Sequence, residues 1–140
     1  MSTEKNKAIV RRLFEEFLNT GDLRAADEFF AVDFVNHSPA RGTTPDREGM
    51  KQFITNLRSA FPDMVLRADD MIAEGDKVAI RMTGRGTHRG DLRGMPGTGK
   101  QFEVPLISII RLADGKVVER WNVYDELLLL QQLGIIPPMG

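Results

Sequence analysis

The stretch Lys116-Val-Val-Glu-Arg-Trp-Asn-Val-Tyr-Asp125 passes directly into Glu126-Leu-Leu-Leu-Leu-Gln-Gln-Leu133, with no Gly or Pro between the two runs. The first run is rich in β-branched and aromatic residues, which is typical of a strand, and the apolar run after it is typical of a helix. Alternation along a strand places one set of side chains on the same face: Val117, Glu119, Trp121, Val123 and Asp125. The rest of the fold is expected to be organised around this strand and helix.

Asp125 ends the strand and has two interpretations. It shares a face with Trp121, the only tryptophan, so its carboxylate would lie in a partly dry pocket, where desolvation favours the neutral form and a proton can be exchanged. Glu119 on that face would add like-charge repulsion. Asp is also a favourable N-cap, and Asp125 directly precedes the predicted helix. Spacing alone favours the cap and leaves the catalytic role open.

Composition limits the class of protein. The 140 residues, 41% hydrophobic and 28% charged, fit a single globular domain spanning 1–140. A formal net charge of −1 argues against nucleic-acid binding, and the lack of cysteine excludes disulfides and thiol chemistry. The charged N-terminus does not resemble a signal peptide, and no run approaches the roughly 20 apolar residues of a membrane span. We therefore expect a cytoplasmic protein that does not bind membranes.

The order of elements predicts an α+β domain. Hydrophobic spacing and caps predict three helices, over 4–19, 22–30 and 44–60, with Thr44 as the cap of the third and a short strand over 34–37. Strands follow over 64–74, 77–88, 101–112 and 116–125, with Pro105 at a bulge or an edge. A closing helix completes a curved mixed or antiparallel sheet wrapped around helices, with a ligand concavity at one end.

Two motifs suggest chemistry that their surroundings do not support. The segment Gly94–Lys100 resembles the start of a phosphate-binding loop, but Gln101 replaces the required Ser or Thr and a strand follows instead of a helix. Gly84–Gly99 is better interpreted as a flexible loop at the pocket mouth. The two histidines, His37 and His88, lack a compact metal-ligand spacing, so no metal site is predicted. Each is a candidate general base or orienting donor if it faces the concavity.

Several short motifs occur in a characteristic order: Asn36-His-Ser-Pro39, Ala60-Phe-Pro-Asp63, Ala73-Glu-Gly-Asp-Lys-Val78, Gly86-Thr-His-Arg-Gly90, Pro96-Gly-Thr-Gly-Lys100, Asp114-Gly-Lys-Val-Val-Glu-Arg-Trp121 with Asp125, and Gln131-Gln-Leu-Gly134. With these motifs the chain resembles the SnoaL-like polyketide cyclase (ester cyclase) family, within the nuclear transport factor 2-like superfamily. The resemblance covers nearly the whole chain. It implies a cone-shaped (cystatin-like) α+β fold.

The resemblance also implies a function. The family aspartate that follows the Trp-bearing strand, here Asp125, is the general acid/base of an intramolecular aldol ring closure that needs no cofactor or metal. The implied ligand is a small or medium apolar carbonyl or polyketide-like compound, and a homodimer through the outer face of the sheet is expected. His88 and His37 are further catalytic candidates. The predicted pocket residues are Trp121, Glu119, Tyr124, Phe14, Phe17, Phe34, Arg81 and Met82.

Two alternatives to ring closure remain at this level. The same superfamily supports epoxide hydrolysis or isomerisation with other sets of carboxylates and arginines. The cone can also serve as a non-catalytic ligand-binding or dimerisation module. A solvent-open Asp125 that caps the last helix would favour the module, whereas Asp125 buried beside Trp121 and a histidine would favour the enzyme.

Overall fold

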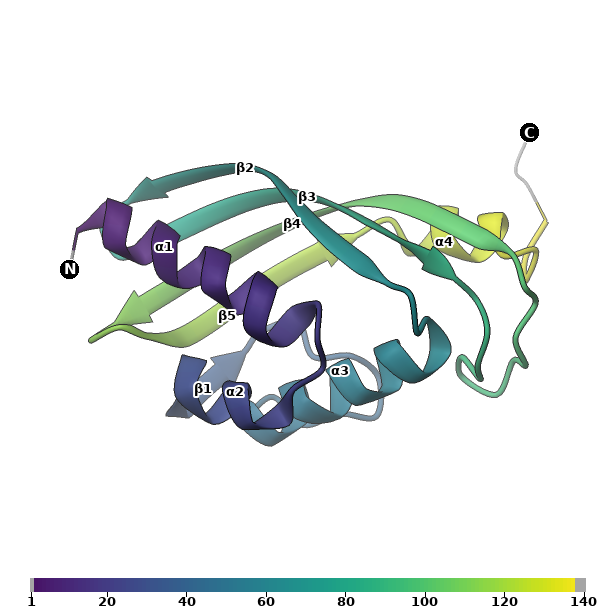
Figure 1. The fold of residues 1–140 in the computed structure, drawn as a ribbon, viewed down its shortest axis with the longest axis horizontal. Helices are drawn as coiled ribbons and strands as arrows, with labels where there is room; N and C mark the ends of the chain where they lie inside the picture. Colours follow the sequence, from purple (N-terminus) through teal and green to yellow (C-terminus); the bar gives the residue numbers. More distant parts are fainter. Residues whose placement is uncertain (1, 138–140) are drawn as a thin grey trace.

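The computed structural model describes residues 2–137, and Figure 1 shows its fold. Three helical elements come first, a short strand and a helix follow, and four long strands and a helix complete the chain: α1 (Thr3–Leu13), the π-helix η1 (Phe14–Leu18), α2 (Leu23–Phe29), β1 (Phe30–Asn36), α3 (Arg47–Ala60), β2 (Val65–Glu74), β3 (Lys77–Thr87), β4 (Gln101–Ala113), β5 (Lys116–Tyr124) and α4 (Glu126–Gln132). The predicted α+β class and the order of its elements are confirmed.

The sheet is mixed, with the strand order β1-β5-β4-β3-β2. β1 runs parallel to β5, and the other neighbouring pairs are antiparallel. The sheet curves over α1, α2 and α3, while α4 lies at the far end of β4 and β5 (Figure 1). β4 pairs with β5 only from Leu106 onward, so on this side Pro105 lies at an unpaired edge. Of the two predicted positions for Pro105, a bulge or an edge, the structure shows the edge.

Side chains that accept backbone N–H groups define where the helices begin. Ser2 caps α1 by accepting from Lys5 N at 3.1 Å, and Asp46 caps α3 by accepting from Gly49 N at 2.9 Å. The predicted cap Thr44 is therefore wrong by two residues, and its hydroxyl instead donates to Asp46. A Cβ at Gly49 would lie 1.7 Å from the Thr44 carbonyl oxygen, so this approach of the loop to α3 requires glycine.

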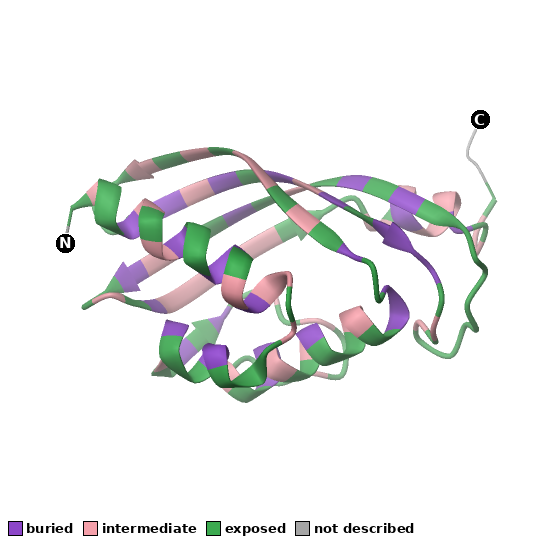
Figure 2. Ribbon diagram, in the orientation of Figure 1, coloured by how far each residue is buried: buried purple, intermediate pink, exposed green. Residues whose placement is uncertain are grey.

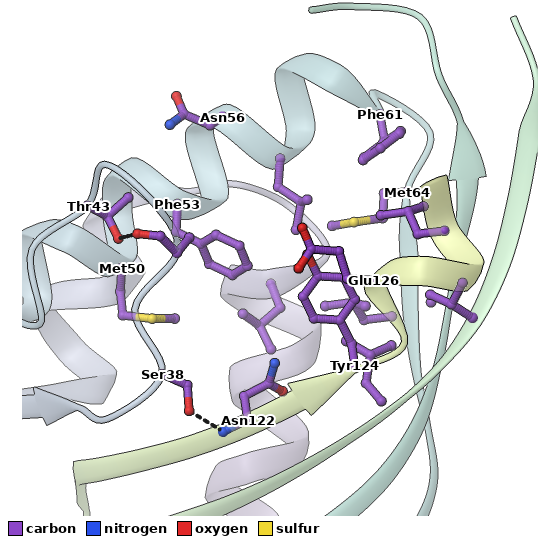
Figure 3. Close-up of a pocket in the computed structure, with 18 of the residues that line it drawn as sticks. Ser38, Thr43, Met50, Phe53, Asn56, Phe61, Met64, Asn122, Tyr124 and Glu126 are labelled. Atoms are coloured by element: carbon purple, nitrogen blue, oxygen red, sulfur yellow. Dashed lines mark hydrogen bonds between the residues drawn. The ribbon is translucent and has the colours of Figure 1, made fainter. Parts of the chain in front are cut away.

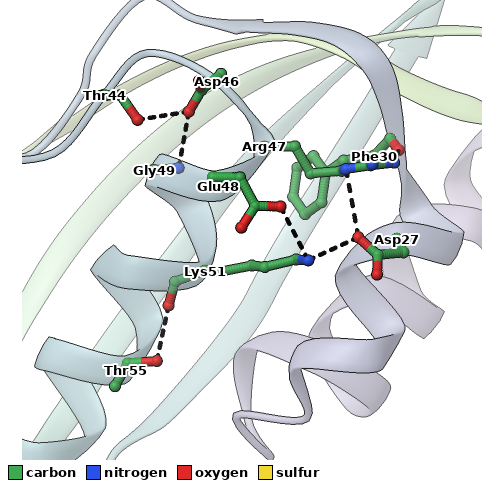
Figure 4. Close-up of polar contacts among 9 residues, drawn as sticks. All are labelled: Asp27, Phe30, Thr44, Asp46, Arg47, Glu48, Gly49, Lys51 and Thr55. Carbon is green, nitrogen blue, oxygen red and sulfur yellow. Dashed lines mark hydrogen bonds and ion pairs between the residues drawn. The ribbon is translucent and has the colours of Figure 1, made fainter.

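An ion-pair cluster on the surface joins α2 to α3 (Figure 4). Asp27 of α2 contacts Lys51 Nζ at 2.8 Å and Arg47 Nε at 3.3 Å, and Lys51 also contacts Glu48 at 3.1 Å. The hydrogen bond with Lys51 lowers the pKa of Asp27. Exposed ion pairs add little to stability, so this cluster links α2 to α3 without being a main source of the stability of the fold.

The main core lies between the concave face of the sheet and α1, η1 and α2 (Figure 2). Its centre is aromatic, with ring centroids of Phe17 and Phe30 at 5.7 Å and those of Phe30 and Phe34 at 4.7 Å. Phe14, Phe17 and Phe34 are each at most 5% exposed and pack in this core. Their prediction as pocket residues is wrong, because the helical segment buries Phe14 and Phe17 against the sheet and β1 turns Phe34 toward the same core.

A β-bulge in β5 inverts the predicted strand faces. Arg111 pairs with Glu119, but the next residue of β4, Leu112, pairs with Val117, so Val118 is the extra residue. Val117 is fully buried in the concave face, and beyond the bulge this face continues with Arg120 instead of Glu119. The prediction that Trp121 and Asp125 share the inner face with Val117 is therefore wrong.

Candidate active site

The concave end of the fold encloses a cavity of about 700 Å3 between α3, the inner face of the sheet, α4 and the loop 88–100 (Figure 3). One wall comes from α3 and the turn after it, with Phe53, Leu57, Phe61 and Met64. The opposite wall comes from the sheet and includes Met82. A mainly apolar enclosure of this size suits a small or medium organic ligand.

The inner face of β5 supplies a row of polar side chains to this apolar cavity. Arg120, Asn122 and Tyr124 all line it, because alternate residues of a strand point to the same side. Successive members of the row are about 7 Å apart along the strand. The strand therefore offers a guanidinium, an amide and a phenol to one ligand.

Asn122 is held at the middle of the row by two serines. Ser108 Oγ donates to Asn122 Oδ1 at 2.5 Å, and the Asn122 backbone N–H donates to Ser38 Oγ at 2.9 Å (Figure 3). Ser108 lies directly opposite Asn122 in the register of β4 and β5. Because the amide oxygen accepts from Ser108, Asn122 can use its amide N–H groups to donate a hydrogen bond to a ligand.

Arg120 lies at the inner end of the row. Its Nη1 donates to Asn36 Oδ1 at 3.3 Å, and its guanidinium carbon lies 5.7 Å from the centre of the Phe53 ring. Within residues 2–137 no carboxylate lies within 4.0 Å of its nitrogens. Burial lowers the pKa of Arg120 to about 10, so it remains a cation at neutral pH.

The opposite end of the row is joined to the loop 88–100. Arg93 of this loop forms an ion pair with Glu126, and its Nη2 donates to Tyr124 Oη at 3.3 Å. Both partners line the cavity and project into it in Figure 3. Burial raises the pKa of Tyr124, so its phenol remains a neutral donor at neutral pH. These contacts hold the loop over the cavity mouth. Its segment Gly94–Lys100, which resembles a phosphate-binding loop in sequence, is followed by β4 and not by a helix.

Asp125 is exposed and does not line the cavity. Its Oδ1 accepts the Leu128 N–H at 2.9 Å, so it is the N-cap of α4. The predicted cap is confirmed, and the predicted partly dry environment is wrong. The bulge at Val118 explains this result, because it places Asp125 on the other side of the strand from the cavity.

The two histidines lie in different environments, and neither lines the cavity. His88 is fully buried beside Phe61 and is held by the Thr98 N–H, which donates to His88 Nδ1 at 3.3 Å. His37 lies on the outer face, where its ring stacks on Trp121 at 4.8 Å. The Nε2 atom of His37 lies 2.7 Å from Glu119 Oε2, and Glu119 also pairs with Arg111.

Among the predicted pocket residues, Tyr124 and Met82 line the cavity. Trp121, Glu119 and Arg81 do not, and Arg81 projects outward with 62% of its side chain exposed. Sequence reasoning missed most of the polar residues of the cavity, among them Ser108, Arg120, Asn122 and Glu126. For Arg120 and Asn122 a one-residue bulge was the missing information, since it exchanges the residues of β5 that face inward with those that face outward.

Residues 2–137 contain no group of three or more His, Asp or Glu residues that could hold a metal ion. None of their helices is long and apolar enough to cross a membrane.

Comparisons with known proteins agree with this geometry. Residues 8–133 match the SnoaL-like polyketide cyclase family. The chain is 33% identical over 138 residues to the aklanonic acid methyl ester cyclase DnrD of Streptomyces peucetius, covering 96% of this chain and 92% of that protein. It is 28% identical over 118 residues to the nogalonic acid methyl ester cyclase of Streptomyces nogalater, covering 83% of this chain and 88% of that protein.

The fold also matches solved structures. TsrD of Streptomyces laurentii superimposes with a TM-score of 0.86 and 30% identity, covering 97% of this chain and 99% of that one. The cavity in the concave sheet, the order of the elements and the family match over nearly the whole chain give the same assignment. The chain belongs to the SnoaL-like polyketide cyclase family.

Proposed function

We propose that this protein binds a polyketide-like carbonyl compound in its cavity and closes a ring in it by an intramolecular aldol reaction. The observation that carries the proposal is the cavity of about 700 Å3, mainly apolar but crossed by the row Arg120, Asn122 and Tyr124. Apolar walls fold a flexible carbonyl chain into a reactive conformation, and the donors select its oxygens. The names of the two cyclase relatives support this substrate class.

The proposed reaction needs one proton carrier. A base removes a proton from a carbon flanked by carbonyl groups, the resulting enolate carbon attacks a second carbonyl carbon, and the new alkoxide receives a proton. One carboxylate can serve both steps, since the first leaves it protonated for the second. The proton balance then closes within the site, so the proposed mechanism uses no cofactor.

Glu126 is the carboxylate that we propose for this role. It lines the cavity beside Tyr124, and Arg93 holds it in place. Asp125, the aspartate implied by the family resemblance, has one carboxylate oxygen occupied by the α4 backbone and is exposed outside the cavity. Arg93 and Tyr124 add two donors near Glu126, which would stabilise negative charge developing on a carbonyl oxygen.

A second candidate function is a ligand-binding module without catalysis. The observation that favours it is the exposed, helix-capping Asp125, since the module needs no acid/base there. Epoxide chemistry has no comparable observation in its favour.

The test uses aklanonic acid methyl ester and nogalonic acid methyl ester, the compounds in the names of the relatives. Ring closure is followed by chromatography, and binding by the shift in thermal unfolding, which grows with occupancy. Turnover that persists after dialysis against EDTA supports the proposal. Binding without turnover favours the module, and the absence of both contradicts a ligand role for the cavity.

We also propose that the protein forms a homodimer through the outer face of the sheet. Ile107, Ile109 and Val123 are 40–68% exposed there, beside Trp121. Contiguous exposed apolar side chains of this kind mark interaction surfaces. Light scattering should give twice the chain mass, and Ile109→Asp should reduce the mass to that of one chain. A wild-type monomer at micromolar concentration contradicts the dimer.

The cytoplasmic location remains a prediction.

A further inference from the structure

Arg120 differs from the arginines that form ion pairs in this chain. Seven others contact a carboxylate: Arg12, Arg24, Arg47, Arg67, Arg81, Arg93 and Arg111. Of the remaining arginines, Arg58 donates to the backbone carbonyls of Met64 and Pro62, and the others, apart from Arg120, are exposed to solvent. Arg120 is instead half-buried, and its exposed part borders the cavity.

The contacts of Arg120 leave most of its hydrogen-bonding capacity unused. A guanidinium has five N–H donors, and the structure assigns one hydrogen bond, to Asn36 Oδ1 at the long distance of 3.3 Å. The Phe53 ring supports the cation from one side. In a site with apolar walls, a cation that lacks a counter-charge is costly to desolvate, and an anionic ligand oxygen would offset this cost.

The carboxylates of the cavity are engaged at the other end of the β5 row. Glu126 pairs with Arg93, and Asp91 Oδ2 accepts the Gly94 N–H at 3.0 Å. Arg120 and Tyr124 are four residues apart on β5, which separates their backbones by about 13 Å. The carboxylates of the cavity therefore lie at the mouth, together with Arg93 and the exposed Arg41, whereas Arg120 is the cation at the inner end.

We propose that the inner end of the cavity, formed by Arg120 and the amide of Asn122, is a subsite for a delocalised oxyanion carried by the ligand. The flat guanidinium fork matches two oxygens that share one negative charge, as in a carboxylate or in the enolate of a 1,3-dicarbonyl. Asn122 adds an N–H donor about 7 Å further along the strand. This inference rests on the proposed function in using the same cavity and ligand class, and it adds the charge of the ligand.

The subsite would distinguish a negatively charged ligand from a neutral one, whereas the relatives are named after neutral methyl esters. A methyl ester carries no charge at its ester group, whereas a free acid or an ionised 1,3-dicarbonyl does. If Arg120 binds the ligand, the free acid must bind more tightly than its ester.

Equilibrium binding tests this preference separately from turnover. The probes are anthraquinone-2-carboxylate, its methyl ester, and an aryl 1,3-diketone whose enolate absorbs at longer wavelength than its neutral form. Wild-type protein should bind the carboxylate at least about tenfold more tightly than the ester, since hydrogen bonds to charged groups are the stronger class. The pKa of the bound diketone should fall by about one to three units, the effect of a nearby opposite charge.

Variants identify Arg120 as the cause. Arg120→Met should abolish both the carboxylate preference and the diketone shift, and Arg120→Lys should retain part of each. Arg85→Met removes an exposed arginine of β3 and should change neither. A carboxylate effect alone assigns the subsite to carboxylates, and a diketone effect alone assigns it to enolates.

Three results would overturn the subsite: equal affinity for acid and ester together with an unshifted diketone, no binding of any probe, or preferences that survive in a folded Arg120→Met protein. Loss of ester turnover with an intact carboxylate preference would instead count against the proposed ring closure and leave the subsite standing.

Discussion

The two faces of β5 carry different chemistry on neighbouring residues. The inner face presents Arg120 and Asn122 to an enclosed cavity. The outer face presents Glu119 and Trp121, which hold His37 between a hydrogen bond and a stacked ring. Both rows are polar and aromatic in sequence, so residue type does not distinguish them. What distinguishes the two rows is their position relative to one extra residue of β5, Val118.

This contrast shows how a small irregularity can decide function. Side-chain direction in a strand has a period of two, so one inserted residue exchanges the inner and outer sets. Val117 is fully buried, and strict alternation from it would place Glu119 and Trp121 in the cavity. The bulge places Arg120 and Asn122 there instead.

Deleting Val118 is the strongest test of this contrast. The shortened strand must either withdraw Val117 from the core or turn Arg120 into the outer face. We expect the free energy of unfolding to fall by about 3 kcal/mol or more, as is typical when a core is disrupted, so the protein should be largely unfolded. Circular dichroism during heating measures this. Val118→Ala, which keeps the bulge, should remain folded, and a deletion variant that melts within a few degrees of wild type would contradict the role of the bulge.

Ser108→Leu tests which face binds the ligand, with a smaller expected effect. The longer side chain would occupy the cavity beside Asn122 and remove the hydrogen bond from Ser108 Oγ. We expect ligand affinity to fall by about tenfold or more, equivalent to about 1.4 kcal/mol, as measured by calorimetric titration. Ile109→Ala changes the next residue, which is on the outer face, and should leave affinity unchanged. Reversed results for the two variants would place the ligand on the outer face.

Glu119→Gln tests the outer face and should give the smallest effect. Hydrogen bonds from His37 and Arg111 lower the pKa of Glu119 in the folded protein. A lowered folded pKa contributes stability that is present above the unfolded value, about 4.3, and is lost as pH falls through the folded value. The variant should therefore melt below wild type at pH 7, and the gap should narrow below about pH 4. A gap that is constant from pH 7 to pH 3 would show that Glu119 acts through packing.

Much of the fold could be predicted because its signals are local. The hydrophobic spacing of the helices over 4–19, 22–30 and 44–60, and the strand patterns over 77–88, 101–112 and 116–125, predicted the order of elements and most of their bounds. The cap at Asp125 was also predictable, because capping depends on the residues that directly follow.

The site could be predicted only in part because it depends on long-range pairing. Tyr124 and Met82 line the cavity as expected, but Arg120, Asn122 and Ser108 required the register between β4 and β5. Phe14 and Phe17 of η1 were assigned to the pocket, yet they pack in the core, since a sequence does not reveal which apolar side chains meet each other and which border empty space.

Turnover of Asp125→Asn and Glu126→Gln, measured side by side on the ester substrates, tests the central claim most directly. Asn retains the helix cap, so Asp125→Asn should fold normally and keep near wild-type activity. Glu126→Gln should lower turnover by about a hundredfold or more, the contribution typical of a general acid/base. Loss of activity in Asp125→Asn, with Glu126→Gln still active, would contradict the account and restore Asp125 as the proton carrier.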